Sequence, residues 1–167
     1  MENAKSPVES VIAVLAAARS MELFAIYQYM SQHYALDDWG YGGLASLTRL
    51  IAIDEMRHAE ELAERIVSIV GAPRSEVAGS VQRGQDLRHI FPFDVLTESE
   101  TLERYNAFLI TCRECGDSVS ACLFERLIEK EQQHHDDFKD VANHIATLGD
   151  AYLACVAGCG RTFRGSD

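Results

Sequence analysis

The chain has 167 residues, a formal net charge of −11 and an isoelectric point near 4.9. Its composition, 47% hydrophobic and 25% charged, is ordinary for a globular protein, and its length suits one domain with a sizeable core. The acidic balance argues against a nucleic-acid partner and favours the attraction of cations. We find neither a signal peptide nor the roughly 20 apolar residues of a membrane span, so we expect a cytoplasmic protein without a membrane partner.

Helical periodicity predicts two antiparallel helices in the first half of the chain. The first begins at a capping box with proline at its first position and covers about residues 6–35. Residues 37–43 contain three glycines and form the turn. The second helix then runs to about Val70 and is stopped by glycine and proline. Residues 74–91 have no sustained period, so we expect a long crossover that returns along the bundle.

The second half repeats this plan. A third helix is expected to begin between Pro92 and Thr97, where two start signals compete. Gly116 marks a tight turn, and a fourth helix ends near Gly149. A short fifth helix follows at about 150–157. Two helix pairs joined by a long crossover indicate an all-α four-helix bundle. We therefore expect one domain over 1–167, with the bundle at about 7–148 and the fifth helix and tail at about 150–167.

The same pattern of acids and imidazole occurs twice. A glutamate is followed 33 residues later by the glutamate of a Glu-x-x-His motif. The two sets are Glu22, Glu55 and His58, and Glu98, Glu131 and His134. All six residues fall where the helical period calls for an apolar side chain. Because a buried charge is costly unless it is paired or bound to metal, the pattern predicts a two-metal centre inside the bundle.

Spacing also predicts how the two ions are shared. Residues three apart lie on one helix face, so each Glu-x-x-His pair can hold one metal. We expect Glu22 to be terminal on the metal of His58 and Glu98 to be terminal on that of His134. Glu55 and Glu131 would bridge the ions. Four carboxylates neutralise two divalent ions, and oxygen-rich ligation suits iron or manganese, whereas zinc would bind without redox chemistry.

The alternative is that the acids are solvated and the periodicity is misassigned. One Glu-x-x-His motif on a helix would be weak evidence against that alternative. Two such motifs, each placed 33 residues after a core-face glutamate, are strong evidence for the metal site.

At these residues the chain resembles bacterioferritins over most of its length. The similar segments are residues 21–29, 38–40, 53–60 and 116–120, and the last Glu-x-x-His motif. The resemblance implies a ferritin-like bundle and a ferroxidase that oxidises Fe(II) with dioxygen or peroxide. It also implies iron storage as a ferric mineral in a homo-oligomeric cage of 24 subunits. A ferredoxin-type reductant is a candidate partner for iron release.

Two further residues have both a structural and a functional interpretation. Met56 is rotated about 100° from the ligand face, as expected of an apolar interface residue. The resemblance implies instead an axial ligand to haem b, shared with its symmetry mate at a two-fold interface. Tyr29 lies on the site face two turns beyond Glu22. It is expected to be a core tyrosine, and the resemblance implies that it is also a one-electron donor to the metals.

Some positions depart from the family pattern. Certain bacterioferritins carry extra acids and histidines on the cage interior near the site, where this chain has Leu50 and Lys130 and keeps Asp54. We therefore do not expect an inner-surface iron site.

The cysteines give little functional signal. Five is an odd number, so no disulfide framework is implied. Cys112 and Cys115 lack a second pair at zinc-ribbon spacing. We expect Cys112 and Cys122 to be buried as small apolar side chains. The roles of Cys155 and Cys159 stay open.

The main rival function is a di-iron peroxidase or oxidase of the rubrerythrin type, without mineral storage. Rubrerythrins usually add a module with four cysteine ligands, and the cysteine spacing here does not fit one. A protective cage of the DNA-binding type is disfavoured, because such cages place their iron site between subunits and often carry a basic tail.

Overall fold

A computed structural model describes residues 6–157. In this part of the chain there are five helices and no strand, which confirms the predicted all-α fold. The helices are α1 (Pro7–Asp38), α2 (Gly42–Ser68), α3 (Leu87–Glu114), α4 (Ser118–Leu148) and α5 (Asp150–Val156).

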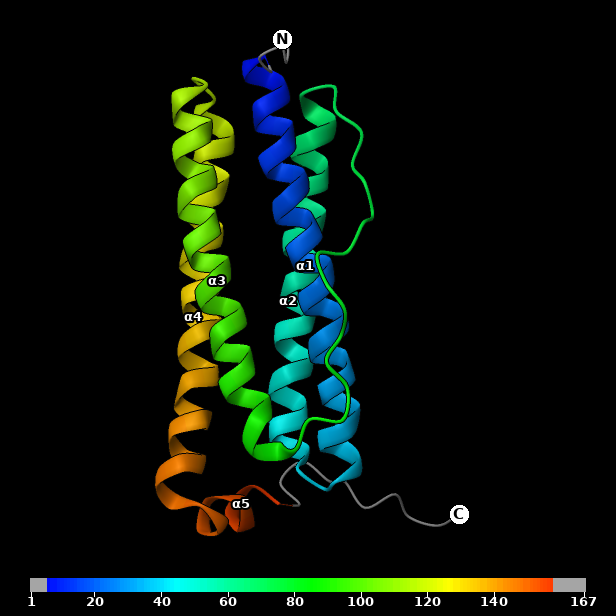
Figure 1. Cartoon of the computed structure of the whole chain (residues 1–167), viewed down its shortest axis with the longest axis vertical. Helices are drawn as coiled ribbons and strands as arrows, with labels where there is room; N and C mark the ends of the chain where they lie inside the picture. The colour runs from blue at the N-terminus through cyan, green and yellow to red at the C-terminus, as the bar shows by residue number, and fades with distance from the viewer. Residues whose placement is uncertain (1–5, 158–167) are drawn as a thin grey trace.

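The four long helices form a bundle in which α1 and α4 run in one direction and α2 and α3 in the other (Figure 1). The packing is most extensive between α1 and α2 and between α3 and α4, as expected for helices joined by short turns. The crossover, residues 69–86, runs beside α1 and α2 and returns the chain to the far end of the bundle. Helix α5 lies across that same end (Figure 1).

Local sequence signals set most helix ends where they were expected. The Ser6 hydroxyl accepts from the backbone N–H of Glu9, and the Glu9 side chain accepts from the backbone N–H of Ser6, at 3.2 and 2.8 Å. Gly40 and Gly116 follow α1 and α3 with φ of 88° and 75°, a conformation that costs other residues strain. The two short turns therefore depend on glycine.

The predicted start of α3 is wrong. The helix begins at Leu87 rather than between Pro92 and Thr97. Asp86 is the N-cap, and its side chain accepts a hydrogen bond of 2.9 Å from the backbone N–H of Arg88. The crossover is correspondingly shifted from the predicted 74–91.

Proline is tolerated in the second turn of this helix because tertiary packing compensates for it. Pro92 removes one backbone hydrogen bond from the helix. Ile90 and Phe91, just before it, are fully buried in the core. Burial of two large apolar side chains stabilises the extra turn by more than a single backbone hydrogen bond contributes.

The interior has two apolar clusters with a charged layer between them. One cluster surrounds Leu15, Leu62 and Phe124, and the other surrounds Leu36 and Phe138. Helix α1 contributes to both, and an 18-residue window of it reaches a mean hydropathy of 1.5, enough by length and composition for a membrane span. This differs from the expectation from the sequence. The same helix buries polar side chains in the layer between the clusters, as a bundle helix does.

Two cysteine predictions can be compared with the structure. Cys112 is buried, as expected, but Cys122 is exposed, because it lies on the opposite side of α4 from the core residue Phe124. Cys155 is exposed on α5. Cys159 lies outside the described residues.

Candidate metal centre

The charged layer consists of the six residues singled out by the repeated motif. Each of them has at most 5% of its surface exposed. They are Glu22 on α1, Glu55 and His58 on α2, Glu98 on α3, and Glu131 and His134 on α4. Every long helix of the bundle therefore sends at least one charged side chain to the same layer.

Their atoms form two overlapping groups. Glu22 and His58 belong to one group, Glu98 and His134 belong to the other, and Glu55 and Glu131 belong to both. Within each group the candidate ligand atoms all lie within 4.8 Å of one another. The structure thus brings the six side chains together with the two glutamates of the Glu-x-x-His motifs at the centre.

The two imidazoles lie between the shared carboxylates. His58 Nδ1 is 2.8 Å from Glu55 Oε2 and 2.9 Å from Glu131 Oε1. His134 Nδ1 is 3.0 Å from Glu55 Oε1 and 3.3 Å from Glu131 Oε2. The rings are stacked with their centroids 5.7 Å apart. Both histidines therefore present the same nitrogen to both acids.

This donor set fits a pair of cations. Oε1 of Glu55 and Oε1 of Glu131 are buried and lack a hydrogen-bond partner, since their short contacts with the imidazoles do not have hydrogen-bond geometry. A buried acceptor left unsatisfied costs roughly 1–3 kcal/mol, and more when it is charged. Metal ions between these oxygens would remove that cost.

Electrostatics in the metal-free chain make the histidines the counter-ions. Burial raises the pKa of Glu55, but hydrogen bonds from His134 and His58 outweigh burial and lower it to about 2. Burial lowers the pKa of both imidazoles, but hydrogen bonds from Glu131 and Glu55 raise it to about 9 for His58 and about 11 for His134. Metal binding through these nitrogens must therefore displace protons.

Glu22 and Glu98 lie at the two ends of the cluster. Burial, followed by repulsion from Glu55 and Glu131, raises the pKa of both carboxyl groups well above the ordinary value. Protonation of these two acids reduces the charge of the layer when no cation is present, and a cation would reverse it.

Each terminal glutamate accepts a hydrogen bond from a buried tyrosine. Tyr29 of α1 donates its hydroxyl to Glu98, and Tyr105 of α3 donates its hydroxyl to Glu22. Burial and the neighbouring carboxylates raise the pKa of both phenols, which keeps them protonated donors. Sequence reasoning singled out Tyr29 and missed Tyr105. The available signal was spacing, because Tyr105 follows Glu98 by seven residues as Tyr29 follows Glu22.

The other predicted positions lie away from the cluster. Met56 is 55% exposed on α2, and Leu50 and Lys130 are exposed as well. Asp54 pairs with Arg57 at 2.5 Å, and its Oδ2 lies 3.9 Å from His134 Nε2. A pocket of about 380 Å³ between α2 and α4 is lined by Asp54, Lys130 and His58, so one edge of the cluster faces it.

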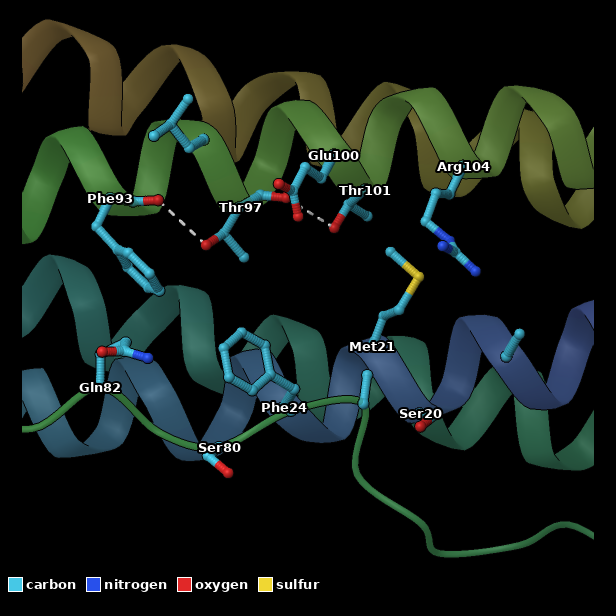
Figure 2. Close-up of a pocket in the computed structure, with 14 residues that line it drawn as sticks. Ser20, Met21, Phe24, Ser80, Gln82, Phe93, Thr97, Glu100, Thr101 and Arg104 are labelled. Atoms are coloured by element: carbon cyan, nitrogen blue, oxygen red, sulfur yellow. Dashed lines mark hydrogen bonds between the residues drawn. The ribbon is translucent and has the colours of Figure 1, made fainter.

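A larger pocket, of about 620 Å³, lies between α1, α3 and the crossover (Figure 2). Met21 and Phe24 point into it from α1, and Thr97 and Thr101 lie opposite on α3 (Figure 2). The sparse packing between these two helices leaves the space open. Met21 and Thr97 directly adjoin the terminal glutamates in sequence, so the pocket lies beside the charged layer.

Comparison with known proteins gives one consistent family. The ferritin-like domain family matches residues 12–148. A bacterioferritin of Desulfovibrio desulfuricans is 53% identical over 148 residues, which are 89% of this chain and 83% of that protein. A bacterioferritin of Mycobacterium tuberculosis is 36% identical over 140 residues, covering 84% of this chain and 88% of that protein.

Solved structures agree with these relatives. The crystal structure of the D. desulfuricans bacterioferritin, which is described as having a diiron site, superposes with a TM-score of 0.91 at 48% identity and covers 98% of each chain. A bacterioferritin of M. tuberculosis superposes with a TM-score of 0.85 at 35% identity and covers 91% of this chain and 96% of that one.

Proposed function

Because this chain belongs to the bacterioferritin family, we propose that it oxidises Fe(II) at the buried cluster and stores the ferric product in an oligomeric cage. The observation that carries the proposal is the pair of overlapping ligand groups that share Glu55 and Glu131. Such sharing holds two cations side by side in a layer closed to bulk water. Two Fe(II) ions so placed can deliver two electrons to one molecule of dioxygen or peroxide.

The ligand assignment is part of the proposal. Glu22 and His58 would hold one iron and Glu98 and His134 the other, with Glu55 and Glu131 between them. The charge of four glutamates equals that of two divalent ions, which supports this assignment. Carboxylate and imidazole ligands suit iron and manganese, so metal analysis of the purified protein decides between the two.

The test removes one shared carboxylate. Glu55→Ala should abolish rapid Fe(II) oxidation while the fold is kept, because the smaller neutral side chain relieves repulsion in the metal-free layer. Anaerobic Fe(II) addition followed by mixing with oxygenated buffer, monitored by ferric absorbance, measures this. Glu60→Ala, an exposed position on the same helix, is the matched control and should oxidise iron at the native rate. Native-rate oxidation in Glu55→Ala would refute the site.

Storage requires a closed assembly, and we propose a homomeric cage of 24 subunits in the cytoplasm. Large apolar side chains are exposed on α1 and α2, including Tyr34 and Val67, and they provide surface for contacts between subunits. Size measurement tests the proposal. A monomer or dimer that still oxidises Fe(II) would instead indicate a di-iron oxidase of the rubrerythrin type.

Haem b at a two-fold interface is a further part of the proposal. The thioether of Met56 is exposed and points away from the metal cluster, so it is free to reach a symmetric partner. Met56→Leu should remove haem absorbance and leave Fe(II) oxidation intact. Electrons delivered through such a haem, from a ferredoxin-type reductant, would release stored iron. Haem retained in that variant would refute the ligand assignment.

A further inference from the structure

The repeat in the sequence extends beyond the six candidate ligands. Glu22, Tyr29, Glu55 and His58 have counterparts exactly one interval later, because Glu98, Tyr105, Glu131 and His134 each follow by 76 residues. The turn glycines Gly40 and Gly116 keep the same interval. The pair α1 and α2 and the pair α3 and α4 are therefore equivalent halves. Each half supplies a tyrosine to the terminal glutamate of the other half.

Tyr105 is held rigidly at this contact. Its side chain is fully buried, and its ring packs edge-on against Phe124, with centroids 5.3 Å apart, and against Phe108 at 6.2 Å. The hydroxyl donates to Oε1 of Glu22. A tyrosine fixed by two aromatic neighbours can impose one orientation on the carboxylate that it contacts.

The surroundings of Tyr105 leave its hydroxyl a single polar task. Asp94 and Gln32 lie near the Tyr29 half, and the equivalent positions on the Tyr105 half are Ala18 and Phe108. Both of these are apolar side chains of the same core region as Tyr105. Removal of the Tyr105 hydroxyl should therefore act through Glu22 alone.

We propose that Tyr105 is a positioning residue for the metal half-site of Glu22 and His58. Its phenol fixes the carboxylate of Glu22 in the orientation that accepts a cation beside Glu55 and Glu131. This inference rests on the proposed function, because it needs the cluster to bind metal. Hydrogen bonds to metal ligands typically change metal affinity by about 10–100-fold when they are removed.

The experiment measures Co(II) affinity at each half-site separately. His134→Ala disables the half-site of Glu98, and adding Tyr105→Phe should then weaken the remaining Co(II) site by about 10–100-fold. In the His58→Ala chain, where only the half-site of Glu98 remains, Tyr105→Phe should change the affinity by less than about 3-fold. Ligand-field absorbance of Co(II) reports both affinities. In the otherwise native chain, Tyr105→Phe should weaken one of two Co(II) equivalents, a result that needs no histidine variant to fold.

The chain offers two matched controls. Tyr29→Phe is the equivalent change in the other half and should show the opposite pattern in the two histidine backgrounds. Tyr27→Phe, at an exposed position of α1, should change neither affinity. The melting temperature of the metal-free protein separates a packing role from a positioning role, because phenylalanine keeps the ring contacts with Phe124.

Distinct results identify distinct failures. If the native chain binds two Co(II) ions and Tyr105→Phe binds both with native affinity, the positioning role is refuted and the proposed function stands. Equal weakening in both histidine backgrounds would show a general packing effect and would also refute it. If the native chain binds no Co(II) at the cluster, the proposed function fails and this inference fails with it.

Discussion

The two halves of the metal centre have the same ligands in different surroundings. Near the Tyr29 half, Asp94 is fully buried and accepts a hydrogen bond of 2.7 Å from Gln32, whose amide also donates to Gln85 at 3.1 Å. On the Tyr105 half the equivalent positions are Ala18 and an aromatic ring. One half is thus connected by polar groups to the crossover, and the other is embedded in apolar packing.

The crossover explains this difference. It runs along α1 and is held there by Gln28, whose side-chain amide pairs with the backbone of Gln82 at 2.8 and 3.3 Å (Figure 1). A second backbone contact joins Ala78 to Ser20 at 3.0 Å. A two-fold repeat of helices has only one crossover, so it necessarily breaks the symmetry. The ligands follow from spacing along each helix pair, whereas the second layer around them follows from the connection.

The largest expected effect comes from the residues that the two halves share. Glu131→Ala should remove both metal equivalents and lower Fe(II) oxidation by more than about 100-fold, because a direct ligand matters more than its hydrogen-bond partner. Glu98→Ala should remove one equivalent and leave the other. Co(II) titration counts the sites. Two sites retained in Glu131→Ala would show that the halves do not share that carboxylate.

Charge placed on the apolar half should be strongly destabilising. Ala18→Asp puts a carboxyl group at the position equivalent to Asp94 but without the amide of Gln32 beside it. An unpaired buried charge costs about 3–5 kcal/mol of the free energy of unfolding. Denaturant unfolding at pH 7 measures the loss, and Ala18→Asn controls for side-chain size. An aspartate variant no less stable than the asparagine variant would contradict the contrast between the halves.

The metal-free protein should lose stability at alkaline pH. The folded-state pKa values of His58 and His134 are raised to about 9 and about 11, so their contribution is complete below the unfolded value near 6.5. It is lost as the pH rises through the folded values. Melting temperatures should therefore fall between pH 7 and pH 10. Protein loaded with Co(II) should lose less, because its imidazoles bind metal and carry no proton to lose. Equal losses would argue against metal at these nitrogens.

The smallest effect is expected on the polar half. Burial raises the pKa of Asp94, so this residue contributes stability that is complete below pH 3.8 and is lost as the pH rises. Asp94→Asn removes that loss and keeps an acceptor for Gln32. We expect it to be at least as stable as the native chain at pH 8, within about 1 kcal/mol, and relatively less favourable at pH 4. Asp140→Asn, exposed on α4, is the control. A stability difference that does not depend on pH would refute the buried titration.

Local rules in the sequence accounted for most of the fold. The capping box, the turn glycines and the helical period located α1, α2, α4 and α5 within a few residues. They failed at Pro92, where proline suggests a helix start but buried Ile90 and Phe91 extend the helix before it. They also failed at Cys122, whose position on the helix places it outside the core. In both cases contact with the rest of the bundle decided the outcome.

The sequence by itself determined which six side chains meet, because a fixed interval on regular helices brings acids and imidazoles to one level of a bundle. Only the tertiary structure decided how they are supported. The bond from Tyr105 to Glu22, the buried acid beside Tyr29 and the pocket between α1 and α3 all join segments more than 50 residues apart. Helical periodicity specifies the face of a residue and its height along one helix. Distances between helices depend on packing and on the path of the crossover, which no local pattern contains.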